Sequence, residues 1–236
     1  MPLTSHLAEL RSCLIKALAA VLAAFIPSFT YAELIFGALT VPLKSLQIPG
    51  LKLIGTAVSE AFFTKMKVAF IASIFLTFPV ILWQTWRFIA PGLYEDEKRY
   101  ARSFVFFGSL FFLLGAWFCY EVMFRVGFRF LLERYQVIEV RPAIRIAEYL
   151  SFSSSLLLAF GVVFELPIVA YFLTRIGLMD HRFLIREIRY GVIFIFILAA
   201  VLAPPDIVAH VLLSFPLAVL YGVSIGAAYL ASRNRS

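Results

Sequence analysis

Six apolar stretches, separated by polar and charged segments, dominate the sequence. A helix needs about 20 apolar residues to cross a hydrocarbon core about 30 Å thick, because each residue rises about 1.5 Å. The predicted spans cover about residues 15–35, 67–89, 102–131, 150–174, 190–204 and 207–230. This pattern predicts an all-α polytopic membrane protein with six transmembrane helices that form one domain, residues 1–236.

Three spans carry a local irregularity. The fourth contains Glu165, and Pro167 removes the backbone hydrogen bond that the carbonyl of Val163 would otherwise accept. The fifth apolar run covers only about 21 Å at the helical rise, so we predict a thinned patch of membrane beside the last hairpin. The sixth contains Pro216, which favours a kink.

The distribution of basic residues predicts the orientation. An even number of spans places both termini on the same side of the membrane. On that side lysines and arginines crowd short turns, whereas on the other side they lie in two longer loops, about residues 36–66 and 132–149. Because the positive-inside rule holds best for short loops, we predict that both termini are cytoplasmic.

The composition agrees with a bilayer environment. Only 15% of the residues are charged, against roughly one quarter in soluble domains. The net charge of +7 is spread singly over the ends of apolar runs, which indicates lipid headgroups rather than nucleic acid as the partner. Cys13 and Cys119 lack the spacing of a disulfide motif or a metal site, so we expect no metal and no cofactor. The amino terminus has no small-residue cleavage site, so we expect the first span to be retained.

The amino-terminal segment predicts a short amphipathic helix. Its apolar face is formed by Leu3, Leu7, Leu10 and Leu14. Glu9 falls on the opposite, polar face. We expect this helix, capped by Thr4, to lie along the cytoplasmic surface before it turns into the first span. Glu9 is then either a solvated acid of an interfacial anchor or an acid held ready for a basic partner.

Three consecutive acids, Glu95, Asp96 and Glu97, follow the second span in the segment W-R-F-I-A-P-G-L-Y-E-D-E-K-R. Acids in the first turn of a helix suit its positive dipole end, and Glu95 with Arg99 forms a favourable i,i+4 pair. The acids are predicted on the same face of the membrane as Glu9, and a carboxylate can bind a guanidinium through two hydrogen bonds. Both a structural role and an acidic patch for an arginine-bearing segment stay open.

Glu165 lies well inside a predicted span. An ionisable group there usually faces the bundle interior or a water-filled cavity. Ser151, Ser154 and Gly161 fall near the same helical stripe, which indicates a face turned to protein or water. The pattern fits equally a protonated side chain that is hydrogen-bonded between helices and a functional group.

The remaining polar residues do not form a catalytic pattern. Asp206 follows two prolines, where an aspartate is a natural helix cap. His6, His181 and His210 are scattered, and the sequence has no Ser/His/Asp grouping, catalytic carboxylate pair, glycine-rich phosphate loop or metal spacing. The sequence therefore argues against an enzyme, including a membrane-embedded hydrolase.

Four segments together resemble the TatC family, the membrane receptor of the twin-arginine protein translocase. They are S-H-L-A-E-L-R (5–11), F-P-V-I-L-W-Q-T-W-R-F-I-A-P-G-L-Y-E-D-E-K-R (78–99), A-F-G-V-V-F-E-L-P (159–167) and A-P-P-D (203–206). They occur in family order and at family spacing over nearly the whole chain. Two positions depart from the family pattern: Cys13 stands where members often carry a second arginine, and Gly222 where many have an acid.

The resemblance implies short fifth and sixth helices and a location in the inner membrane of a prokaryote. It implies a receptor that binds the paired arginines of signal peptides on folded cargo and assembles with TatA- and TatB-like single-span proteins and with further copies of itself, driven by the proton gradient. By motif position the signal-peptide site would comprise Glu9, Arg11, Phe88, Pro91, Glu97 and Arg99. Glu165 corresponds to the family's intramembrane acid, and Pro42 and Asp206 correspond to its outer-face positions.

A second hypothesis is a proton-coupled secondary transporter in which Glu165 relays protons. An intramembrane acid beside a proline is a usual feature of transporters. However, such transporters commonly have paired halves with two interrupted helices, and the sequence shows no such symmetry or internal repeat.

Overall fold

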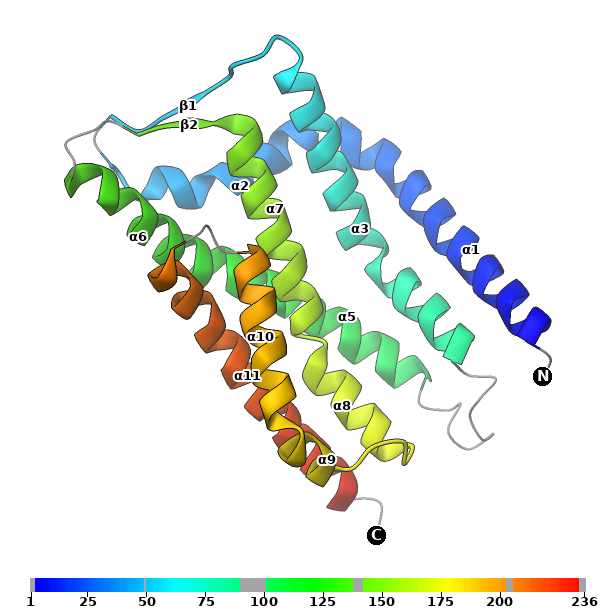
Figure 1. Cartoon of the computed structure of the whole chain (residues 1–236). Helices are drawn as coiled ribbons and strands as arrows, with labels where there is room; N and C mark the ends of the chain where they lie inside the picture. The colour runs from blue at the N-terminus through cyan, green and yellow to red at the C-terminus, as the bar shows by residue number, and fades with distance from the viewer. Residues whose placement is uncertain (1–2, 49, 90–100, 138–141, 203–205, 234–236) are drawn as a thin grey trace. The chain divides into compact units, whose positions relative to one another are not determined.

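The structure is a computed structural model that describes residues 3–48, 50–89, 101–137, 142–202 and 206–233. Its elements are α1 (Leu3–Thr30), α2 (Ala32–Ser45), β1 (Lys52–Ile54), α3 (Glu60–Ile89), α5 (Ala101–Phe118), η2 (Cys119–Met123), α6 (Phe124–Val137), β2 (Ala143–Arg145), α7 (Ile146–Val163), α8 (Leu166–Arg175), α9 (His181–Arg186), α10 (Ile188–Leu202) and α11 (Ile207–Arg233) (Figure 1). They divide into two compact units. Unit 1 contains Met1–Ala38 and Val58–Leu110, and unit 2 contains Leu39–Ala57 and Phe111–Ser236.

Most of the described chain is helical and apolar. Among the described residues, the helical segments long and apolar enough to cross a membrane are His6–Thr30, Glu60–Ile89, Ala101–Glu133, Ile146–Arg175 and Ile207–Arg233. A shorter apolar helix, α10, has 15 residues and covers only about 22 Å at the helical rise. The all-α polytopic fold class is therefore confirmed, together with a short helix at the fifth predicted span. The number of membrane crossings and the side of the termini stay predictions.

Two expectations about single helices are wrong. The amino-terminal segment does not form a separate surface helix, because α1 continues without a break from Leu3 to Thr30. No glycine or proline separates the amphipathic stretch from the apolar run, so nothing ends the helix there. The last helix is not short, since α11 has 27 residues and continues through Pro216. A proline is tolerated inside a membrane helix because local adjustments satisfy the freed backbone group again.

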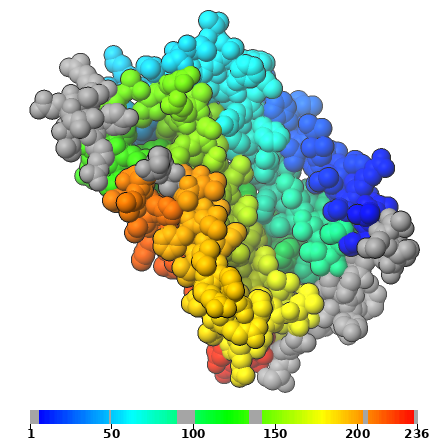
Figure 2. Space-filling view, in the orientation of Figure 1, coloured from blue at the N-terminus to red at the C-terminus, as the bar shows by residue number. Residues whose placement is uncertain are grey.

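In unit 1, α1 and α3 pack against each other as an antiparallel pair (Figures 1 and 2). The buried stripe of α3 has helical spacing and includes Val68, Ile71, Phe78, Leu82 and Trp86. At one end of the pair, Lys65 donates a 2.8 Å hydrogen bond to Glu33 and lies over the ring of Phe29. This hydrogen bond lowers the pKa of the exposed Glu33 carboxyl below its usual value.

In unit 2, α5 and α7 approach closely where each carries a glycine. A Cβ atom on Gly115 would lie 2.5 Å from the carbonyl oxygen of Phe160 and 2.7 Å from Cβ of Phe164. A Cβ atom on Gly161 would lie 2.6 Å from the ring of Phe112. Small residues let helices meet in lipid, where close packing takes the place of the hydrophobic driving force. The two glycines therefore hold α7 against α5.

A single π turn, η2, carries the third span past Glu121, as the sequence predicts. Such turns inside α-helices are frequent at functional sites. Here the turn places Cys119 fully in the core. Beyond it, the ring of Phe128 lies 5.2 Å from the rings of both Phe124 and Tyr149, which connects α6 with α7.

The carboxy-terminal part of unit 2 gathers α8 to α11. Helix α11 packs against α8 and buries small side chains that include Ser224, Ala228 and Ala231. The ring of Tyr221 covers Gly191 of α10, and its hydroxyl donates a 2.9 Å hydrogen bond to the carbonyl of Leu184. Helix α10, orange in Figure 2, lies on the outside of this unit with most of its apolar side chains exposed.

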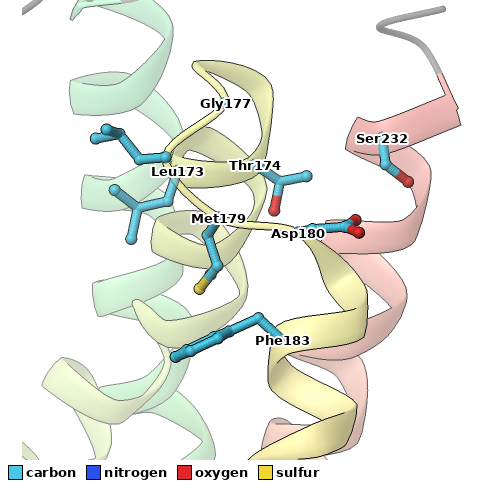
Figure 3. Close-up of a pocket in the computed structure, with 8 residues that line it drawn as sticks. Leu173, Thr174, Gly177, Met179, Asp180, Phe183 and Ser232 are labelled. Carbon is cyan, nitrogen blue, oxygen red and sulfur yellow. The ribbon is translucent and has the colours of Figure 1, made fainter.

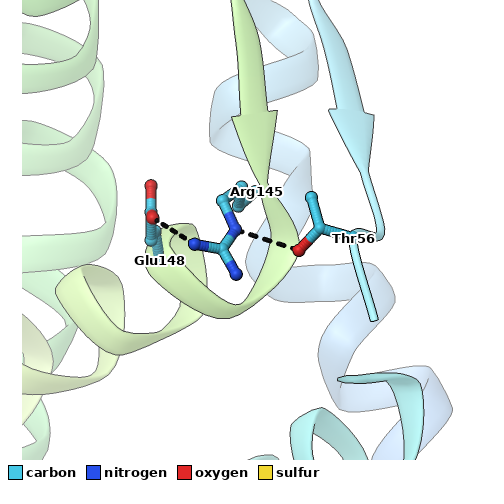
Figure 4. A network of polar contacts seen from close by, with 3 residues as sticks. All are labelled: Thr56, Arg145 and Glu148. Atoms are coloured by element: carbon cyan, nitrogen blue, oxygen red, sulfur yellow. Dashed lines mark hydrogen bonds and ion pairs between the residues drawn. The ribbon is translucent and has the colours of Figure 1, made fainter. Parts of the chain in front are cut away.

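Two short strands, β1 and β2, lie in segments that the sequence analysis treated as loops. They pair in parallel, with Leu53 opposite Ile144. Arg145 donates hydrogen bonds to the hydroxyl of Thr56 at 3.0 Å and to the carboxylate of Glu148 at 3.1 Å (Figure 4). Strands of three residues are too short for an alternating pattern to predict them.

Replacing Gly115 with alanine is expected to destabilise the protein by about 1–3 kcal/mol, because the carbonyl of Phe160 cannot give way without moving α7. Thermal unfolding of the purified protein in detergent, followed by circular dichroism, measures the loss. Gly226 on α11 is the matched control, since nothing lies within 4 Å of a Cβ atom built there. Equal melting temperatures for Gly115→Ala and Gly226→Ala would contradict the close approach.

Candidate functional site

At one end of unit 1, the start of α1 meets the end of α3 (Figure 1). The imidazole ring of His6 stacks on the ring of Phe88, with centroids 4.4 Å apart and planes inclined by 23°. Nδ1 of His6 lies 4.0 Å from Oε2 of Glu9. The structure thus brings two predicted site residues, Glu9 and Phe88, together through a histidine. We call His6, Glu9 and Phe88 the amino-terminal cluster.

Glu9 is the acidic group of this cluster. Its Oε2 atom is covered by protein and has no hydrogen-bond partner among the described residues, although the side chain as a whole is 41% exposed. A carboxylate oxygen that is removed from water without a donor is costly. The group therefore favours an incoming N–H donor, above all a charged one.

A second unpaired acceptor lies near the end of α3 that meets the start of α1. The amide oxygen of Gln84, one helical turn before Phe88, is buried and has no hydrogen-bond partner among the described residues. Trp86 fixes this end of the helix, because its buried ring packs on Phe104 with centroids 5.1 Å apart. Both unpaired oxygens in this part of unit 1 are acceptors, so its chemistry suits a cationic donor rather than an anion.

The other predicted members of the signal-peptide site are only partly described. Arg11 is exposed on α1. Cys13, which departs from the family pattern and is not a predicted member, is buried one turn after Glu9, where a thiol packs as a small apolar group. Three predicted site residues lie outside the described residues: Pro91, Glu97 and Arg99.

His6 is the functional candidate that the sequence analysis missed. A signal was present, because residues three apart on a helix are neighbours, so the motif S-H-L-A-E-L-R places His6 beside Glu9. The stack on Phe88 joins residues that are far apart in the sequence, and only the packing of α1 on α3 reveals it.

Glu165 lies at the break between α7 and α8 in unit 2, where Pro167 stands in the first turn of α8. Its side chain is 7% exposed, and neither carboxyl oxygen has a hydrogen-bond partner among the described residues. Within the described chain, Glu165 therefore does not form the hydrogen bond between helices that was one of the two readings of its position. The predicted polar stripe is confirmed in part: Ser154 and Gly161 are buried, whereas Ser151 is exposed.

The two predicted outer-face residues lie in unit 2. Asp206 caps α11, since the backbone N–H of Ala209 donates a 3.3 Å hydrogen bond to its Oδ2 atom, and the predicted cap is confirmed. Pro42 is buried inside α2, and its carbonyl accepts a 2.7 Å hydrogen bond from the hydroxyl of Ser45.

A grouping of Asp, His and Ser occurs in unit 2, but its geometry does not suit catalysis. Oδ1 of Asp180 lies 2.7 Å and Oγ of Ser232 lies 3.3 Å from the same ring nitrogen, Nδ1 of His181. A Ser-His-Asp triad needs the acid and the serine on opposite ring nitrogens. Within the part of the chain that the structure describes, no three His, Cys, Asp or Glu side chains are placed to hold a metal ion.

The chain is similar to translocase proteins over nearly its whole length. The family model described as Sec-independent protein translocase protein (TatC) matches residues 5–216. The protein of that name from Campylobacter jejuni is 41% identical over 224 residues, which cover 94% of this chain and 91% of that protein. The one from Desulforapulum autotrophicum is 40% identical over 225 residues, which cover 95% and 83%.

The fold is similar as well. A crystal structure described as the twin arginine translocase receptor TatC has a TM-score of 0.87 and 35% sequence identity, and the match covers 97% of this chain and 100% of that one. The family match includes the amino-terminal cluster, Glu165 and Asp206. The resemblance of the four sequence segments is therefore confirmed, and the chain belongs to the TatC family of Sec-independent protein translocase proteins.

Proposed function

We propose that this chain is the receptor and core scaffold of a twin-arginine export system, and that the amino-terminal cluster binds the paired arginines of a signal peptide. Membership of the TatC family supports a non-enzymatic role in protein translocation. The observation that carries the site is the covered Oε2 atom of Glu9, which lacks a hydrogen-bond donor beside the stacked rings of His6 and Phe88.

The chemistry of this site fits guanidinium groups. A guanidinium presents five N–H donors in a planar fork, and a carboxylate can accept two of them at once. Glu9 supplies one carboxylate and Glu97 the other, so each of the two acids binds one of the two neighbouring arginines. The ring of Phe88 offers a face on which a guanidinium can stack, and the amide oxygen of Gln84 offers a further acceptor.

We place the cluster on the cytoplasmic side of the inner membrane of a prokaryote, where both termini lie. Arg11 and Arg87 are exposed around this end of unit 1, as the positive-inside rule favours. The scaffold assembles with TatA- and TatB-like single-span proteins, with folded cargo and with further copies of itself. Transport is driven by the proton gradient, because the sequence has no glycine-rich nucleotide loop.

One observation favours a second function, a proton-coupled transporter. Glu165 is buried beside a helix break and has no hydrogen-bond partner among the described residues, which is the environment of a proton relay. The family match, which concerns protein translocation, favours the receptor instead.

Replacing Glu9 and Glu97 with glutamine is expected to abolish photocrosslinking of a twin-arginine signal peptide, because an amide keeps the size of each side chain but loses the charge that holds a guanidinium. Crosslinking in inverted membrane vesicles measures the effect. Glu148→Gln, which removes an exposed acid of unit 2, is the matched control. Undiminished crosslinking in a normally inserted double variant would remove the site assignment.

Changing both arginines of the signal peptide to lysine is expected to weaken binding about tenfold or more. An ammonium carries a similar charge but cannot make the two parallel hydrogen bonds of a guanidinium, and each 1.4 kcal/mol is a factor of ten. Competition between the two peptides for the purified receptor gives the ratio. Equal affinities would mean that charge alone is recognised.

The purified chain in liposomes is expected to show no proton-coupled uptake of small solutes, because the receptor has no transport cycle of its own. Fluorescence of a trapped pH dye after a solute or pH jump measures uptake, and Glu165→Gln is the comparison. Uptake that disappears in Glu165→Gln would establish the transporter in place of the receptor.

A further inference from the structure

Unit 2 contains a cavity of about 480 Å³ at the turn between α8 and α9 (Figure 3). We call it the α8–α9 pocket. Its lining residues are Leu173, Thr174, Gly177, Leu178, Met179, Asp180, Phe183 and Ser232. None of them belongs to the amino-terminal cluster or to the other positions that the family resemblance assigns. The pocket combines oxygen atoms on one side with apolar side chains on the other.

Thr174 gives this pocket an unpaired polar group. Its side chain is almost completely buried, at 2% exposure, and its hydroxyl has no hydrogen-bond partner among the described residues. A threonine in a helix commonly bonds the carbonyl one turn before it, as Ser154 and Thr77 do in this chain. A buried hydroxyl without a partner costs free energy that a ligand in the pocket would recover.

Asp180 is the second unusual group. It stands at the N-cap position of α9 with extended backbone angles, yet its side chain makes no capping hydrogen bond. Asp206, at the corresponding position of α11, does make one. The carboxylate of Asp180 instead lies 2.7 Å from Nδ1 of His181 and is 53% exposed at the pocket. One of its oxygen atoms is thus paired with His181, and because an ionised carboxylate accepts several hydrogen bonds, the exposed group can also accept one from a ligand.

The oxygen atoms in the pocket select for a cationic donor. The hydroxyl of Ser232 donates to the carbonyl of Tyr229 at 2.8 Å, and its oxygen also lies 3.3 Å from Nδ1 of His181, which leaves one lone pair to accept from a ligand. Figure 3 shows the oxygens of Thr174, Asp180 and Ser232 gathered between the end of α8 and the end of α11. One carboxylate with two hydroxyls accommodates a primary ammonium, whose three N–H bonds need three acceptors, and it repels a bare anion.

The position of the pocket identifies the molecule that carries the ammonium. The spans Ile146–Arg175 and Ile207–Arg233 both end beside it, so it lies where the membrane meets water. Leu178 and Phe183 at its rim are 70% and 47% exposed, and the adjacent Arg182 is exposed as well. A zwitterionic phospholipid fits this arrangement of groups. Its ammonium enters the pocket, its phosphate contacts Arg182, and its acyl chains lie along the apolar rim.

From these contacts we infer that the α8–α9 pocket binds the headgroup of an aminophospholipid of the phosphatidylethanolamine class. Its ammonium contacts Asp180, Thr174 and Ser232. Phosphatidylcholine is excluded because its quaternary ammonium has no N–H bond to donate. Phosphatidylglycerol is excluded because it has no cation to offset the carboxylate.

Native mass spectrometry of the full-length chain in detergent, titrated with the three lipids carrying identical acyl chains, tests this inference. We expect phosphatidylethanolamine to bind about tenfold more tightly than the other two, the scale of one charge-assisted hydrogen bond. Asp180→Asn should remove the preference, and Thr174→Val, which has nearly the same shape, should reduce it. Glu187→Gln is the matched control, because this acid of the same region does not line the pocket.

Several outcomes would overturn the inference. Equal binding of the three lipids by the unaltered protein is one, and a preference that persists in Asp180→Asn with an unchanged melting temperature is another. If a lysine-bearing peptide occupies the pocket while the protein shows no preference among the lipids, the pocket binds a protein partner and not a lipid. If Asp180→Asn unfolds, the lipid preference of Thr174→Val decides, since this variant keeps every charge.

Discussion

Hydrocarbon offers backbone amides and carbonyls no partner other than one another, and the architecture of this chain follows from that constraint. Helices meet it over long apolar segments, against which a polar group without a partner stands out. Glu9 near the start of α1, Thr174 near the end of α8 and Glu165 at the break between α7 and α8 all hold oxygen atoms without a hydrogen-bond partner among the described residues. The three candidate groups therefore lie close to a start, an end or a break of the helical hydrogen-bond ladder.

Packing between helices depends on a related limit. Lipid tails are as apolar as the side chains, so helices hold together through close contact rather than through exclusion from water. In unit 2 the contact of Gly115 with the backbone of Phe160 meets this need, and the small buried residues of α11 suggest the same principle where it packs on α8. The end of α11 and the turn after α8 are held together as a result, which places Ser232 beside Asp180 in one pocket.

Much of the fold could be predicted from the sequence because hydropathy and helix punctuation are local signals. The apolar runs locate the spans, and an aspartate after two prolines predicts the cap at Asp206. The separate surface helix was predicted wrongly, although the absence of a breaker after Glu9 already favoured a continuous helix. The parallel pairing of Leu53 with Ile144 could not be predicted, because it joins three-residue strands about ninety positions apart.

The candidate sites, too, could be predicted from the sequence only in part. The motif containing Glu9 indicates an acid on a helix face, but the stack of His6 on Phe88 is a tertiary contact that no local pattern contains. Asp180 and Asp206 make the point more sharply, because both stand directly before a helix. One carboxylate accepts the backbone N–H of its own helix and is structural, whereas the other leaves its helix uncapped and faces a cavity with a buried hydroxyl. The partner of an acid, rather than its position, therefore separates a structural carboxylate from a binding one, and by that criterion Glu9 belongs with Asp180.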